Sequence, residues 1–298
     1  MKTTSRISSS TSPKRLTVTD TAAAKRIAED YYDSEDADNF YALIWGGEDI
    51  HIGLYEDPPG DIREASRRTV EFMASRLSLD SNSRVLDIGA GYGGAARYLA
   101  KTTGASVTCL NVSEVENERN RAQTREQGLE HLVSVEHGTF EAIPEGDSSF
   151  DLVWSQDAIL HSGNRTVVLD EVTRVLKDGG EFIFTDPMQA DTIANPADLQ
   201  PIYDRIHLPN LASIAYYSDA LSQRGFEVVD ILPMLDQLRR HYFRVRQELQ
   251  SRRSELAAHV SSGYIDRMLA GLQHWIDGAD RELLNWGVLH FRKGSGAV

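Results

Sequence analysis

The chain contains little cysteine, no long apolar run and few basic residues for its acids. Cys109 is the single cysteine among 298 residues, which excludes an intrachain disulfide and argues against a thiolate zinc site. No apolar run approaches the roughly 18 residues of a membrane-spanning helix. These absences predict a soluble protein of the reducing cytoplasm, without a membrane partner.

Positive charge is also scarce: 31 Lys and Arg face 45 Asp and Glu, a formal net charge of −14. A phosphate backbone would meet a repulsive field, so we expect no nucleic-acid partner. The run Leu238–Arg246 is basic with interleaved aromatic residues, and we interpret it as the arginine-rich solvent face of a helix. The histidines show no metal-ligand spacing beside a carboxylate, so no metal is predicted.

The N-terminal residues 1–19 are rich in Ser and Thr and contain no acid, a composition typical of a disordered tail. We divide the rest, residues 20–293, into a lid of about 20–80, a core of about 81–232 and 283–293, and a helical cap of about 233–282. The lid includes an amphipathic helix predicted from Asp61 to about Leu79.

From Arg84 onward, short β-rich runs alternate with helical patterns, which indicates a parallel sheet covered on both faces. The expected strands are Arg84–Ile88, Ser106–Leu110, Leu132–Glu136, Phe150–Ser155, Glu181–Thr185, Phe226–Ile231 and Leu284–Arg292. The helices expected between the early strands are Ala95–Thr102, Glu114–Gln127 and Thr166–Leu176. Lys177-Asp178-Gly179-Gly180 is interpreted as the glycine end of the third helix.

Beyond Pro187 the pattern becomes mainly helical, at Leu199–His207, Tyr217–Arg224, Leu235–Val260 and Tyr264–Asp277. We therefore predict an α/β fold, a doubly wound seven-stranded Rossmann-like sheet with its last strand antiparallel. The helical cap is expected over the carboxyl ends of the strands, where ligands bind in open α/β sheets.

The sharpest motif is a glycine loop that follows the first strand, Asp87-Ile88-Gly89-Ala90-Gly91-Tyr92-Gly93-Gly94. Glycines allow a tight turn from strand to helix and a close approach of ligand to backbone. With Gly94 as its last glycine the loop fits a dinucleotide fingerprint. With Gly93 last it fits the D-x-G-x-G-x-G loop of S-adenosylmethionine (SAM) methyltransferases. The glycines alone do not decide.

Three neighbouring segments favour the second interpretation. A NAD site should carry an acid about 20 residues after the loop, but the next strand leads to Asn111. Gly138–Pro144 with Phe150-Asp151, and Val175–Gly180, resemble further motifs of class I SAM-dependent methyltransferases. That resemblance implies SAM as cofactor, with S-adenosylhomocysteine (SAH) as product and no metal. The residues that it assigns to the cofactor in these motifs are Gly89, Gly91, Gly93, Asn111, Val112, Thr139 and Phe140.

The sequence departs from the commoner family pattern at two of these positions. Asn111 replaces the usual Asp or Glu, and Thr139 replaces the usual Asp. An amide can still bond a ribose hydroxyl, but as a neutral and weaker partner.

The segment Phe40–Tyr55 resembles the sarcosine/dimethylglycine N-methyltransferases, which form glycine betaine. Trp154–Ser162, Thr185–Met188 and His274–Ile276 support the same family, and the likeness extends from Ala28 to Lys293. It implies further cofactor contacts from Tyr41, Trp45, Ile50, His51 and Gln156. The phosphoethanolamine methyltransferases share the Asp157–His161 motif, so a phosphoethanolamine-type or other small-amine substrate is the alternative.

Methyl transfer to nitrogen needs a free lone pair, so some group must take the proton of the substrate ammonium. His161 is the candidate, paired with Tyr32 by resemblance to the phosphoethanolamine enzymes. Asp157 is expected to stabilise the amine's cationic form. Arg205 and His207 are expected to hold the substrate anion, and the remaining substrate contacts predicted are Met188 and Trp286.

Two rivals from other classes are an NAD(P) oxidoreductase and a SAM-binding module without catalysis. The oligomeric state, monomer or homodimer, and the number of methyl groups added are left open by the sequence.

Overall fold

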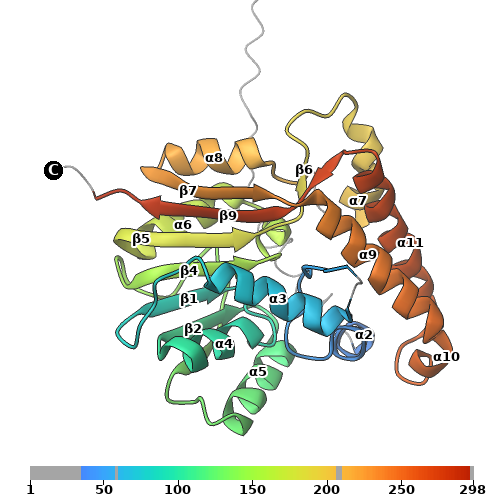
Figure 1. The fold of residues 1–298 in the computed structure, drawn as a ribbon, viewed down its shortest axis with the longest axis horizontal. Helices are drawn as coiled ribbons and strands as arrows, with labels where there is room; N and C mark the ends of the chain where they lie inside the picture. Colours follow the sequence, from blue (N-terminus) through green and yellow to red (C-terminus); the bar gives the residue numbers. More distant parts are fainter. Residues whose placement is uncertain (1–34, 58–59, 206–209, 296–298) are drawn as a thin grey trace, which may run out of the picture.

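Buried apolar runs form a seven-stranded sheet at the centre of the protein (Figure 1). The computed structural model describes residues 35–57, 60–205 and 210–295. The strand order is β3-β2-β1-β4-β5-β9-β7, and β9 runs antiparallel to both neighbours. The predicted fold class is therefore confirmed. The strands are β1 (Arg84–Ile88), β2 (Ser106–Asn111), β3 (Val133–His137), β4 (Phe150–Gln156), β5 (Leu176–Thr185), β7 (Phe226–Pro233) and β9 (Gly287–Lys293).

Helices cover both faces of the sheet because its strands are apolar on both sides. One face packs against α6 (Arg165–Val175) and α8 (Ile214–Ser222). The other packs against α3 (Ile62–Ala74) and α4 (Gly94–Thr103). Next to α4, α5 (Glu114–Glu126) packs on β2 and β3. None of the described helices is long and apolar enough to cross a membrane.

A helical layer lies beyond the carboxyl ends of the parallel strands (Figure 1). Its long helices pack together through the apolar positions of their facing sides, and α2 joins them through Phe40 and Ile44. A two-stranded ribbon of β6 and β8 adjoins this layer. The elements are α2 (Glu35–Trp45), α7 (Gln200–Arg205), α9 (Leu235–Ser251), α10 (Arg253–Leu256), α11 (Ser262–Asp280), β6 (Met188–Gln189) and β8 (Leu284–Asn285), with 3₁₀ turns at Ile159–His161 and Pro196–Leu199.

The structure differs from the sequence prediction at the predicted glycine end of α6. That helix stops at Val175, and its capping residue Leu176 is already extended. Residues 177–180 lie inside β5, where the pairing with β4 shifts from Phe150–Leu176 to Leu152–Glu181. The glycines serve this bulge, so the prediction of a helix cap was wrong. Gly179 has φ +75°, a conformation that glycine adopts without penalty.

Two further differences concern the cap. The single helix expected over Leu235–Val260 is divided between α9 and α10. Helix α7, which our division placed in the core, packs on α11 instead. The tail, Tyr32 and His207 lie outside the described residues.

Candidate active site

A cleft of about 750 Å³ opens at the carboxyl ends of β1, β2 and β4. The sheet order reverses between β1 and β4, which is the position where open α/β sheets bind their ligands. The cleft therefore has the location expected for a nucleotide-containing cofactor. Its lining residues are Ile50, Gly89, Gly91, Leu110, Asn111, Val112, Glu116, Gly138, Thr139, Phe140, Glu141, Gln156, Asp157, Ala158 and His161.

The glycine loop forms the floor of this cleft. Gly89 has φ +75°, and a Cβ there would lie 2.3 Å from the Cβ of Ala158. Gly93 also has a positive φ, but a Cβ there would meet the side chain of Asn120 at 2.2 Å. Gly89 and Gly91 thus face the cleft, whereas Gly93 is not among its described lining residues and permits the packing of α4 on α5.

A second cleft of about 320 Å³ adjoins the first and shares Ile50, Gly89, Gly91 and Gln156 with it. Its other walls are strongly polar, with Glu48, Asp49, His51 and Asp87. The buried Nε2 of Gln156 has no hydrogen-bond partner among the described residues. This arrangement suits a ligand that carries both ammonium and carboxylate groups, as the methionine part of SAM does.

Two buried carboxylates of the second cleft have opposite pKa shifts. Burial raises the pKa of Asp87 to about 7. Burial also acts on Asp49, but His51, Arg67 and Arg97 outweigh it and lower the pKa of that carboxyl. Asp49 is thus the fixed negative charge at this wall.

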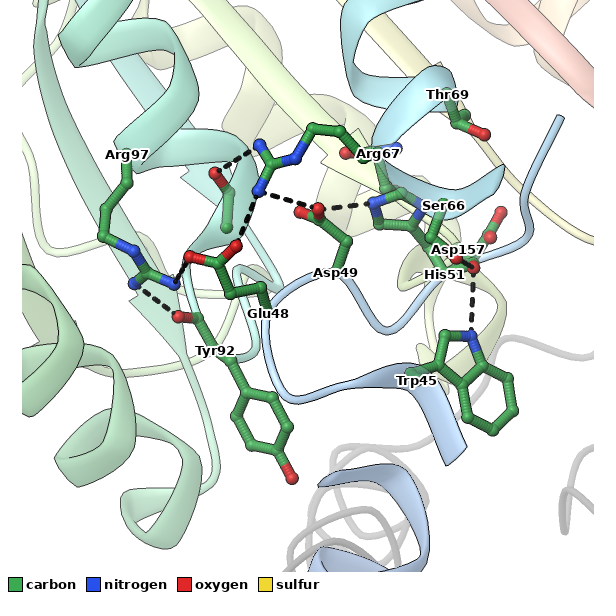
Figure 2. A network of polar contacts seen from close by, with 12 residues as sticks. Trp45, Glu48, Asp49, His51, Ser66, Arg67, Thr69, Tyr92, Arg97 and Asp157 are labelled. Carbon is green, nitrogen blue, oxygen red and sulfur yellow. Dashed lines mark hydrogen bonds and ion pairs between the residues drawn. The ribbon is translucent and has the colours of Figure 1, made fainter. Parts of the chain in front are cut away.

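Figure 2 shows how the lid segment that carries Asp49 is held by α2 and α3 and, through an ion pair of Glu48 with Arg97, by the core. Arg67 of α3 forms ion pairs with Glu48 at 3.0 Å and Asp49 at 2.9 Å. The carbonyl of His51 accepts hydrogen bonds from Trp45 Nε1 at 3.2 Å and Ser66 Oγ at 2.9 Å. The two clefts are therefore closed on this side by a loop that several buried hydrogen bonds hold.

Asp157 lies where the lid, the sheet and the final strand meet. Its Oδ2 accepts from the Ile52 amide at 2.7 Å, and its Oδ1 accepts from Trp286 Nε1 at 2.8 Å. Its φ of +52° is a strained conformation for a residue that is not glycine. Burial raises the pKa of Asp157, although His51 and the two hydrogen bonds oppose that shift.

His161 closes a 3₁₀ turn beside Asp157 and also lines the cleft. Burial, assisted by the charges of Arg165 and Arg205, lowers its pKa to about 4. The imidazole is therefore neutral at pH 7, because its surroundings disfavour the protonated form. Asp186 anchors the turn, because it accepts from the Leu160 amide at 2.9 Å and from the Tyr217 hydroxyl at 2.7 Å.

The other predicted residues fall into two groups. Ile50, Asn111, Val112, Thr139, Phe140 and Gln156 line the first cleft, and His51 lines the second. Tyr41 and Trp45 instead pack against each other at a tilt and meet Phe40 edge to face. Met188 is buried in the apolar core, and Arg205 donates to Met268 Sδ at 3.0 Å. Trp286 is buried and reaches the site through its indole N–H.

Sequence reasoning missed several polar residues that surround the clefts. Asp49 and Glu48 lie inside the lid segment that carried the family resemblance, so a signal for them was present. Arg67 sits on an amphipathic helix, where an arginine is ordinarily interpreted as a surface residue. Glu116 and Glu141 line the first cleft, and nothing in the motif spacing singled them out.

Comparisons with known proteins agree with this geometry. Residues 86–184 match the methyltransferase domain family. The chain is 55% identical over 268 residues to the sarcosine/dimethylglycine N-methyltransferase of Halorhodospira halochloris, covering 90% of this chain and 96% of that protein. It is 48% identical to the enzyme of the same name from Aphanothece halophytica, covering 91% and 98% of the two chains.

A solved structure gives the same result. A protein from Galdieria sulphuraria, assigned as a sarcosine dimethylglycine methyltransferase, superposes with a TM-score of 0.84 at 43% identity, over 90% of this chain and 100% of that one. The sheet, the glycine loop and the clefts define a SAM-dependent methyltransferase. Within that class, the chain belongs to the sarcosine/dimethylglycine N-methyltransferase family.

Proposed function

We propose that the protein transfers methyl groups from SAM to the amine nitrogen of sarcosine and dimethylglycine, and so forms glycine betaine. The observation that carries this proposal is Asp157, a carboxylate whose two oxygens are fixed by Ile52 and Trp286 at the wall of the cofactor cleft. The two N–H donors favour the ionised form of this carboxyl against its burial, and a carboxylate at that point favours an amine that becomes a quaternary ammonium. The names of the close relatives support the same substrates.

SAM supplies the electrophilic methyl group when it is bound. The residues of this chain contribute mainly position, since holding two reactants in the attacking geometry can remove roughly 7–11 kcal/mol from a barrier. Gly89 and Gly91 allow the cofactor to approach the backbone, and Asp157 orients the amine. The lid loop, held by Trp45, Ser66 and Arg67, excludes water from this junction.

A proton must leave the substrate ammonium before its nitrogen can attack. His161 is the acceptor in this proposal, because it lines the cleft in the turn that follows Asp157 and its imidazole is neutral at physiological pH. Arg205 is proposed to hold the substrate carboxylate, and its charge is close enough to His161 to lower that pKa. Its planar guanidinium suits a bidentate pair with a carboxylate.

In the deciding experiment, the protein is incubated with SAM and one of four amines, and the product masses are measured by mass spectrometry. The amines are glycine, sarcosine, dimethylglycine and phosphoethanolamine. We expect mass gains of one methyl group from dimethylglycine and of one and two from sarcosine. A gain from phosphoethanolamine alone would assign the protein to that substrate class. If no amine gives a product but calorimetry shows that SAH binds, the protein is a binding module. If calorimetry shows that NAD binds and SAM does not, the protein is an oxidoreductase. Cytoplasmic location is expected but is independent of these results.

A further inference from the structure

The two departures from the methyltransferase pattern, Asn111 and Thr139, each lie next to a glutamate of the same cleft. The side-chain amide of Asn111 donates from Nδ2 to Glu116 Oε2 at 2.8 Å. The hydroxyl of Thr139 donates to a carboxylate oxygen of Glu141. At both motif positions, a neutral residue donates a hydrogen bond to the carboxylate of a nearby glutamate.

Glu116 is the better placed of the two acids. It is 4% exposed, yet it lines the cleft together with Asn111 and Val112. It lies in the first turn of α5, where its own N–H donates to the Ser113 hydroxyl at 3.2 Å. Asn117 donates to the backbone carbonyl of Asn111 at 3.2 Å, which fixes the end of β2 against the same turn.

We infer that Glu116, held by Asn111, provides the carboxylate that binds the ribose hydroxyls of the cofactor. With its Nδ2 engaged, Asn111 retains an acceptor oxygen, and the pair as a whole carries one negative charge. A carboxylate at position 111 would place a second charge within about 3 Å of Glu116, and two acids so close repel each other. The amide of Asn111 avoids this repulsion and donates a hydrogen bond to Glu116 instead.

The inference rests on the proposed function in one respect, that SAM is the cofactor, and calorimetry tests it without turnover. Glu116→Gln keeps the shape of the side chain and removes the charge. We expect it to raise the Kd for SAH about tenfold, since a hydrogen bond to a charged group contributes more than a neutral one. Glu118→Gln, an exposed acid on the same helix, removes the same charge and should leave the Kd unchanged.

A ligand that lacks the ribose 2′- and 3′-hydroxyls separates binding from a structural role. We expect the Kd of this SAH analogue to be the same, within twofold, for wild type and Glu116→Gln. Asn111→Asp should weaken SAH binding, and Asn111→Asp combined with Glu116→Gln should recover most of it. These results together would support the inference.

Two results would overturn it. One is equal weakening of SAH and the analogue by Glu116→Gln, which would mean that Glu116 only stabilises the start of α5. The other is an unchanged Kd for SAH in a variant that melts at the wild-type temperature. Failure of the wild type to bind SAH would instead refute the proposed cofactor, so the two failures are distinguishable.

Discussion

The proposed cofactor side and the proposed substrate side of this site are built in different ways. Much of the cofactor side is main chain and pairs of residues close together in sequence, such as Gly89 with Gly91 and Asn111 with Glu116. The substrate side depends on side chains far apart in sequence. Asp157 is held there by Ile52 of the lid and by Trp286 near the end of the chain. Short motifs therefore specify much of the cofactor side, whereas the tertiary fold assembles the substrate side.

The largest expected effect concerns the glycine loop of the cofactor side. Gly89→Ala places a Cβ 2.3 Å from Ala158 at φ +75°, so both strain and overlap oppose it. We expect a loss of about 3 kcal/mol in unfolding free energy and no measurable SAH binding. Gly128→Ala has a similar φ of +68° and no atom within 4 Å of its Cβ. It should cost about 1 kcal/mol and leave SAH binding intact, as denaturant melts and calorimetry would show.

Equal effects of the two alanines would contradict this account of the loop, because backbone strain alone would then explain both. Retained SAH binding in Gly89→Ala would mean that Ala158 moves aside easily.

Asp157→Asn tests the substrate side. The substitution removes the charge and turns an amide N–H₂ toward one of two N–H donors, Ile52 or Trp286. We expect kcat/KM for dimethylglycine to fall about 100-fold, equivalent to about 2.7 kcal/mol. The Kd for SAH should change less than threefold. Asp178→Asn, at an exposed acid, is the control for charge alone.

A loss of SAH binding as large as the loss of activity would show that Asp157 belongs to the cofactor side and not to the substrate side.

These two variants also show what sequence could and could not predict. The alternation of strands and helices and the glycine loop follow from contiguous residues, and the structure confirms that fold. The hydrogen bonds of Asp157 to Ile52 and Trp286 join three segments, and no local pattern encodes such a meeting. Position in a family motif likewise does not give side-chain direction: Met188, expected at the substrate, is buried in the core.

Trp286→Phe should have a smaller and more specific effect on catalysis at the substrate side. Phenylalanine keeps most of the buried ring area but removes the indole N–H that lies 2.8 Å from Asp157 Oδ1. A lost hydrogen bond to a charged acceptor is worth about 1.5 kcal/mol, so we expect about a tenfold decrease in kcat/KM. Trp275→Phe, a buried tryptophan of the cap stacked on Tyr242, controls for the change in packing. Similar kcat/KM values for the two variants would show that the indole N–H of Trp286 does not position Asp157 for catalysis.

The smallest effect concerns pH, and it tests whether the substrate side is desolvated. Burial and two arginines lower the pKa of His161 to about 4, so the folded enzyme should keep the imidazole neutral as pH falls. At pH 5.5 about 3% would be protonated, against about 90% for an ordinary histidine of pKa near 6.5. The protonation of the free amine substrate affects wild type and His161→Gln equally, and therefore cancels in the ratio of their kcat/KM values. That ratio should stay constant from pH 8 to 5.5. A ratio that collapses near pH 6.5 would show a solvated His161, and hence a substrate side that stays open to water while the cofactor side is closed.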